Sequence, residues 1–189
     1  MFRGPRWLKS VFARIVRATK RVPTFQWTEI EGTGVFLGSV PQSDEQLRAL
    51  RNEAGVLAVV TLNQRWEPQV PGGVSAACGR AGLAHLHLPT PDYSVPRQAD
   101  IERAVAFIRE HVPKGGVYVH CNAGRGRSAV CALAYLMQSG GWTAREAYDR
   151  VAAQRRITPL PTRMLGFPRP QWLALLRFEA SLARRSRGS

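Results

Sequence analysis

Hydrophobic residues in this chain gather first into short runs that predict β-strands. Residues 33–39, 56–62, 83–88 and 117–120 are rich in valine, leucine and aromatic side chains. Runs of about four to eight such residues, bounded by glycine, proline or polar residues, are typical of strands buried in a sheet. We therefore expect a sheet that contains these four segments.

Longer segments between the runs repeat apolar residues at helical spacing. Ser43 and Gln46 have the spacing of a capping box, which predicts a helix that ends before Gly55. A second helix begins near Arg97 and carries apolar residues at positions 101, 105, 108 and 112. Three further helices are expected, from position 129 to Gly140, from 143 to 154, and near 172–182. Strands that alternate with helices predict a layered α/β fold.

Two segments are rich in glycine and proline. We expect residues 68–82 to form a loop or a poorly ordered insert. Residues 158–170 contain four prolines, and we expect them to form an extended connection to the last helix.

The last predicted strand leads into the most informative segment of the chain. Residues 117–131 read VYVHCNAGRGRSAVC, in which five residues, including Gly124 and Gly126, separate Cys121 from Arg127. A strand, a glycine-containing loop and a helix N-terminus can together surround one tetrahedral anion with backbone N–H groups. The pattern predicts a cysteine-dependent phosphatase. The alternative is a buried cysteine that closes a strand, followed by a solvated arginine turn.

The phosphatase reaction requires the residue types found in this loop. A thiol beside an arginine and a helix N-terminus has a lowered pKa, so Cys121 can attack phosphorus as a thiolate. Arg127 offers a planar fork for two phosphoryl oxygens. Ser128 can donate a hydrogen bond to the sulfur. We expect His120 to orient the loop from behind through hydrogen bonds and not to act as a base.

An acid must also protonate the leaving oxygen of the substrate. Asp92 lies in a loop with three prolines, between the strand predicted at 83–88 and the helix that begins near Arg97. It is the favoured candidate, although Pro-Asp is also common in surface turns. Glu67, beside Trp66, is a weaker candidate.

The other cysteines and histidines are expected to be structural. We expect Cys78 and Cys131 to pack in the core. His85 and His87 share one face of a strand, with no acidic or cysteine partner nearby in the sequence. The histidines have no metal-ligand spacing, and we expect neither a metal nor a cofactor.

The loop from His120 to Ser128 resembles the signature of the protein tyrosine phosphatase superfamily, in its dual-specificity branch. Within that branch it closely matches the mitochondrial phosphatidylglycerophosphate phosphatases. Other segments are similar to that group as well. Its opening strand corresponds to residues 34–41, and its second strand with the following loop corresponds to 59–67. Its acid loop corresponds to 88–96, and its next helix to the segment from 99 onward. The resemblance covers about residues 29–157. It implies a twisted central sheet of four to five strands flanked by helices, with the site at the carboxyl ends of the strands.

The resemblance also implies roles for single residues. It makes Cys121 the nucleophile, Arg127 the phosphate binder and Asp92 the general acid, with Ser128 as the hydroxyl partner of the thiolate. The phosphate is expected to lie against Asn122, Ala123, Gly124, Arg125, Gly126 and Arg127. One position departs from the group, which commonly has a lysine directly after the nucleophile where this chain has Asn122. The missing cation disfavours a headgroup with several phosphates, although Arg125 remains in the loop.

Positive charge is concentrated at the two ends of the chain. The formal net charge is +14, and residues 1–21 hold seven lysines and arginines and no acid. The apolar residues of this segment, Trp7 and Phe12 among them, fall on one half of a helical wheel. Such a helix is typical of an anionic membrane surface or of a transit peptide. The alternative is a helix docked on the catalytic domain. Nucleic acid is not an expected partner, because Trp7 and Phe12 belong to the apolar stripe.

Composition bears on two further properties, insertion into a membrane and the redox state of the compartment. No apolar run approaches the roughly 20 residues that a membrane-spanning helix needs. Three scattered cysteines and a catalytic thiol indicate a reducing compartment. We expect a monomer at the mitochondrial inner-membrane surface in a eukaryote, or a cytoplasmic, peripherally membrane-associated protein otherwise.

The chain is expected to divide into a basic amphipathic segment (1–28), a catalytic domain (29–157) and a proline-rich connection with a basic helix (158–189). A lipid phosphatase acting on phosphatidylglycerophosphate is the leading hypothesis. A dual-specificity protein phosphatase acting on phosphotyrosine, phosphoserine or phosphothreonine is the alternative. Asp92 and Ser128 disfavour two others, a phospho-ligand binding module without turnover and a sulfur-transfer enzyme.

Overall fold

The computed structural model describes residues 24–158, 163–164 and 167–187. The amphipathic helix predicted within residues 1–21 lies outside them. Among the described residues, no helix is both long and apolar enough to cross a membrane.

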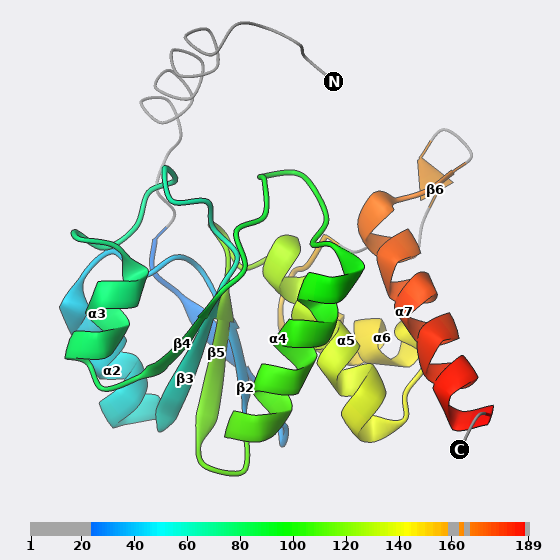
Figure 1. Ribbon diagram of the computed structural model, residues 1–189, viewed down its shortest axis with the longest axis horizontal. Coiled ribbons are helices and arrows are strands. Elements are labelled where there is room, and N and C mark those ends of the chain that lie inside the picture. Colours follow the sequence, from blue (N-terminus) through cyan, green and yellow to red (C-terminus); the bar gives the residue numbers. More distant parts are fainter. Residues whose placement is uncertain (1–23, 159–162, 165–166, 188–189) are drawn as a thin grey trace, which may run out of the picture.

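Five strands form one mixed sheet in the order β1-β2-β5-β3-β4 (Figure 1). Their bounds are Trp27–Ile30 (β1), Val35–Gly38 (β2), Val56–Thr61 (β3), Ala84–His87 (β4) and Gly116–His120 (β5). β1 is antiparallel to β2, and all other pairs are parallel. The predicted α/β fold is confirmed. The pattern of the sequence did not predict β1, which is a short edge strand with only Ile30 fully buried.

Helices cover both faces of the sheet (Figure 1). α2 (Asp44–Ala54) and α3 (Val74–Arg80) cover one face, and α4 (Gln98–His111) and α5 (Arg127–Gly140) cover the other. α6 (Ala144–Gln154) and α7 (Pro170–Arg187) pack on α5, and a short hairpin of β6 (Arg163–Met164) and β7 (Phe167–Pro168) precedes α7. In α7, Leu175 and Phe178 are fully buried, so this helix belongs to the same core as α5.

Two cores follow from the alternation of side chains along the central strands. Val60 and Val119 join the core under α4 and α5. Their neighbours Val59 and Tyr118 point to the core under α2 and α3. This period of two is what a strand imposes, and it makes each central strand apolar on both faces.

The predicted helix boundaries depend on caps that the structure contains. The Ser43 side chain accepts from the Gln46 backbone N–H, and Gly55 ends the helix in the left-handed conformation, with φ of 65°. At α6, Thr143 and Glu146 form a complete capping box. In a capping box the Gln46 side chain would accept from the N–H of the N-cap residue Ser43. Here it accepts from the N–H of Gln42, one residue earlier.

The prediction that residues 68–82 form a loop or a poorly ordered insert is wrong in part. Residues 74–80 form α3, in which Val74, Ala77 and Cys78 are buried. These three residues share one helix face against the second core. The glycines and prolines around them obscured this short apolar face, which tertiary packing stabilises. Cys78 is a buried core residue, as expected.

Candidate active site

Residues 121–126 form a loop between β5 and α5, at the carboxyl edge of the parallel strands. Four consecutive carbonyls of this loop accept hydrogen bonds from groups outside it. The carbonyl of Asn122 accepts from Val40 N–H at 3.0 Å. Those of Ala123 and Gly124 accept from the Arg155 guanidinium, each at 3.2 Å. The carbonyl of Arg125 accepts from the Thr158 N–H at 2.8 Å and from its hydroxyl at 3.1 Å. Because each N–H points opposite to the preceding carbonyl, the loop amides face inward and form an anion-binding nest.

Gly124 allows this path of the backbone. Its φ is +65°, and a side chain there would collide with the carbonyl of Gly38 on β2. A residue with a Cβ would therefore be strained and would displace the loop from the sheet. The N-terminus of α5, which begins at Arg127, completes the nest with the positive end of its dipole.

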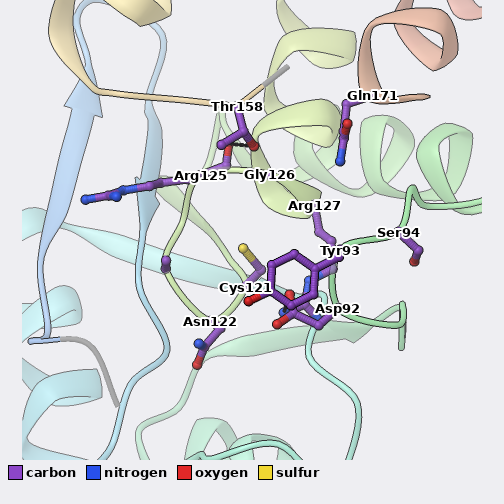
Figure 2. Close-up of a pocket in the computed structure, with 11 residues that line it drawn as sticks. Asp92, Tyr93, Ser94, Cys121, Asn122, Arg125, Gly126, Arg127, Thr158 and Gln171 are labelled. Atoms are coloured by element: carbon purple, nitrogen blue, oxygen red, sulfur yellow. Dashed lines mark hydrogen bonds and ion pairs between the residues drawn. The ribbon is translucent and has the colours of Figure 1, made fainter. Parts of the chain in front are cut away.

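The sulfur of Cys121 lies inside this nest (Figure 2). Ser128 Oγ donates to the Cys121 sulfur at 3.3 Å. Burial raises the pKa of the thiol, but the charge of Arg127, the Ser128 hydroxyl and the N–H groups of Ser128 and Arg125 outweigh it. The result is a pKa below the ordinary value of a cysteine. By contrast, burial raises the pKa of Cys78 to about 12 and also raises that of Cys131. Cys121 is thus the one of the three with nucleophilic character.

The guanidinium of Arg127 is held by a buried carboxylate and a backbone carbonyl. Glu67, buried in the loop after β3, accepts from Arg127 Nη1 at 2.6 Å and from Nη2 at 2.8 Å. The carbonyl of Thr90 accepts from Nη1 at 2.8 Å. Both charged side chains are almost fully buried. A bidentate pair of this kind sets the plane of the guanidinium before any substrate binds.

Asp92 reaches the same guanidinium from the loop after β4. Its Oδ1 lies 3.0 Å from Arg127 Nη2, and its side chain is 22% exposed. Nη2 and Nε share the edge through which an arginine binds a phosphate side-on. A phosphate on this edge would therefore compete with Asp92 for Nη2.

Asp92, Cys121 and Arg127 line one pocket of about 220 Å³ (Figure 2). Its other lining residues are Tyr93, Ser94, Asn122, Ala123, Arg125, Gly126, Thr158 and Gln171. Tyr93 is 91% exposed. The Arg125 side chain runs away from the Cys121 sulfur (Figure 2), and the charge that lowers the pKa of the Cys121 thiol is that of Arg127.

The structure thus brings together all the residues that the sequence placed at the site. Cys121, Arg127 and Asp92 line the pocket, Ser128 is buried against the Cys121 sulfur, and His120 is fully buried behind the loop. Glu67, which the sequence offered as a weaker acid candidate, is instead the buried partner of Arg127. Among the described residues there is no group of three potential metal ligands.

Sequence reasoning missed Arg155 and Thr158. Both lie beyond the end of α6 and support the loop from outside, about 30 residues away along the chain. The only signal was the position of Arg155 at the end of a predicted helix, which is a weak one.

Several known proteins are similar to this chain. A family model described as "Polymorphic toxin system, DSP-PTPase phosphatase" matches residues 32–141, a range that spans Asp92, Cys121 and Arg127. The mouse protein named phosphatidylglycerophosphatase and protein-tyrosine phosphatase 1 is 32% identical over 162 residues, which are 79% of this chain and 83% of the mouse protein. The Arabidopsis thaliana phosphatidylglycerophosphate phosphatase PTPMT2 is 35% identical over 133 residues, 69% of this chain and 56% of that protein.

A solved structure shares the fold. The crystal structure of PTPMT1 in complex with PI(5)P superimposes with a TM-score of 0.74 at 30% identity, over 85% of this chain and 98% of that one. The similarity therefore extends beyond the loop to nearly the whole of the solved protein.

Proposed function

Because this chain belongs to the dual-specificity branch of the protein tyrosine phosphatase superfamily and is a cysteine-based phosphatase, we propose that it removes the phosphate of a membrane phospholipid, phosphatidylglycerophosphate above all. The observation that carries the chemistry is the inward-facing loop around the Cys121 sulfur, with Arg127 held by Glu67 beside it. We further propose that the reaction proceeds through a thiophosphate on Cys121.

In the first step, the Cys121 thiolate forms a bond to phosphorus as the bond to the leaving oxygen breaks. The loop N–H groups and Arg127 bind the equatorial oxygens, where negative charge gathers in the transition state. The proton for the leaving oxygen comes from Asp92. In the second step, water attacks phosphorus, Asp92 accepts the water proton, and the sulfur leaves as a thiolate that the Ser128 hydroxyl stabilises.

The contact between Asp92 and Arg127 suggests how the acid becomes available. Without substrate, Arg127 Nη2 lies 3.0 Å from Asp92 and favours the carboxylate. A phosphate that binds through Nε and Nη2 displaces Asp92, which then faces the leaving oxygen and no longer a cation. Loss of that cation, and approach of a dianion, both favour the protonated form that the first step requires.

A lipid substrate has two supports. The mouse relative is named a phosphatidylglycerophosphatase and the Arabidopsis relative a phosphatidylglycerophosphate phosphatase, and the PTPMT1 structure has PI(5)P bound. In this chain, Tyr93 stands almost fully exposed beside the acid, at the mouth of the pocket. Tyrosine favours the membrane–water interface, where its ring is apolar and its hydroxyl is hydrated. We propose that the protein acts at such a surface, with the basic segment 1–21 bound to anionic headgroups.

The deciding experiment compares phosphate release from phosphatidylglycerophosphate in vesicles with release from a phosphotyrosine peptide. The Cys121→Ser variant serves as the blank. A preference for the lipid supports the proposal. A preference for the peptide would assign the protein to the protein phosphatases, the alternative that the name of the mouse relative includes.

Asp92→Asn should lower kcat/KM, which reports the first step, by about 10²-fold for an alkyl phosphate, because asparagine cannot protonate an alkoxide. The loss should be much smaller for p-nitrophenyl phosphate, whose leaving group needs little protonation. Steady-state rates with the two substrates test this. The matched control is Asp149→Asn, because Asp149 is an exposed carboxylate on α6 that pairs with Arg145. Equal losses for both substrates would contradict the role of Asp92 as an acid.

Deleting residues 1–21 should weaken binding to anionic vesicles, since it removes seven positive charges and the apolar stripe. Hydrolysis of a small soluble phosphate should stay the same. Vesicle sedimentation over a range of salt concentrations measures the first quantity. Unchanged sedimentation would exclude the segment as the membrane contact.

A further inference from the structure

Behind the phosphate loop, four polar side chains form a continuous line of hydrogen bonds. His120 Nδ1 lies 3.4 Å from the carbonyl of Cys121. Its Nε2 lies 2.8 Å from Thr61 Oγ1, which in turn lies 2.9 Å from His85 Nε2. The line ends at Ser75 Oγ, 3.0 Å from His85 Nδ1. We name Ser75, His85, Thr61 and His120 the imidazole network.

Sheet register places these residues together. Thr61 on β3 pairs with His120 on β5, and Val59, two residues earlier, pairs with His85 on β4. All of these side chains point to the face covered by α2 and α3, and Ser75 comes from the first turn of α3. Thr61 therefore stands between the two imidazoles, and the network crosses the neighbouring strands β5, β3 and β4.

Both imidazoles are neutral near pH 7. Burial lowers the pKa of His120 to about 3. Burial, with the neighbouring His87, lowers the pKa of His85 to about 4. The groups that face His85 are His87 on its own strand, Arg65 in the loop after β3, and the network members themselves. None of them is an acid that would favour an imidazolium.

Neutrality gives the network a single direction. A neutral imidazole has one N–H donor and one acceptor nitrogen, and a carbonyl only accepts. His120 must therefore donate from Nδ1 to the Cys121 carbonyl, so its Nε2 accepts from the Thr61 hydroxyl. Thr61 has one hydrogen, already used, so it accepts from His85 Nε2–H. His85 Nδ1 then accepts from the Ser75 hydroxyl.

We propose that His85 is a positioning residue, which fixes the Nδ1–H tautomer of His120 through Thr61 and so holds the Cys121 peptide and its thiolate in place. Without His85, the Thr61 hydroxyl can rotate and accept from His120 Nε2–H. A lone pair of His120 would then face the Cys121 carbonyl and repel it. The assignment rests on the proposed function, but it concerns a residue that touches neither the pocket nor the sulfur.

The surface end of the network opens into a second cavity of about 390 Å³. Its lining includes Ser75, His85, His87 and Arg65. Water can enter from this side, and a substitution at His85 therefore alters a half-buried position and not the closed core. This position makes His85 suitable for substitution.

The first test uses the unaltered protein. Long-range ¹H–¹⁵N spectra of histidine-labelled protein report which ring nitrogen carries the proton. We expect His120 as the Nδ1–H tautomer and His85 as the Nε2–H tautomer. With four histidines in the chain, single substitutions assign the signals. The opposite tautomer at either residue would overturn the proposal.

The second test measures the pKa of the Cys121 thiol from the pH dependence of alkylation by iodoacetamide, with the Cys121 peptide followed by mass spectrometry. His85→Leu should raise this pKa by about half a unit, which slows alkylation about threefold below the pKa. His85→Gln, whose amide can still donate to Thr61, should restore the wild-type value. The same ratio is expected in kcat/KM on the acid side of the pH profile.

His87→Leu is the matched control. The wild-type His87 lies on the same strand and face as His85, but its imidazole donates to the Asn63 carbonyl and not to the network. If His87→Leu shifts the thiol pKa as much as His85→Leu, or if His85→Gln behaves like His85→Leu, His85 has no positioning role. Because alkylation requires no substrate, this result is separate from a failure of the proposed phosphatase activity.

Discussion

Replacing Cys121 with serine should lower kcat by about four orders of magnitude or more with every phosphate substrate. The replacement keeps the size of the side chain but removes the thiolate, whose pKa the Arg127 charge, the Ser128 hydroxyl and the loop amides lower against the effect of burial. A serine hydroxyl in the same nest stays protonated near pH 7. Substrate binding should persist, because the loop amides and Arg127 are unchanged.

Phosphate release and a binding assay with the variant test this expectation together. Cys78→Ala is the matched control, since Cys78 is also buried but lies on α3 and packs in the second core, and it does not line the pocket. It should turn over substrate at the wild-type rate. Residual activity of Cys121→Ser within tenfold of wild type would contradict both the nucleophile and the covalent intermediate.

Arg127→Lys should lower kcat/KM by about 10³-fold. In the structure one guanidinium serves the two carboxylate oxygens of Glu67, the carbonyl of Thr90 and Asp92. An ammonium has three hydrogens at one point, so it cannot hold both carboxylate oxygens of Glu67 and bind two phosphoryl oxygens together. The pKa of the Cys121 thiol should also rise, because the cation that lowers it changes position.

Steady-state kinetics and thiol alkylation measure these two effects. Arg145→Lys, on the exposed face of α6, controls for the exchange of arginine by lysine. Glu67→Gln is the companion variant, and it leaves Arg127 buried without a full counter-charge. Breaking a buried pair from one side costs about 3–5 kcal/mol of unfolding free energy, which urea denaturation can detect. If Arg127→Lys retains wild-type kcat/KM, Arg127 is not the phosphate ligand.

Much of the fold was predictable because its signals are local. The central strands are continuous apolar runs, and the caps at Ser43 and Thr143 mark helix starts within four residues of sequence. β1 and α3 were missed for a common reason. Each is short, and each is stabilised by the surface it packs against: β1 by pairing with β2, and α3 by its contact with the second core. Local patterns carry little information about such elements.

Some residues of the candidate site were likewise predictable from neighbouring sequence, and others were not. Cys121, Arg127 and Ser128 lie within eight consecutive residues between a strand and a helix, so their spacing alone predicts an anion loop with a nucleophile. The role of Glu67 depends on a contact between residues 60 positions apart, and Arg155 reaches the loop across more than 30. A carboxylate beside a tryptophan gives no local sign that it faces an arginine on another element.

By itself, the sequence predicted the alternation of strands and helices, the candidate phosphate loop and the candidate nucleophile, because each arises from neighbours along the chain. Only the tertiary structure decided which acid approaches the pocket, which acid supports Arg127, and that His85 reaches His120 through Thr61. Those relations depend on sheet register and on the packing of separate loops. Both arise only when distant segments fold together and their buried polar groups must find partners.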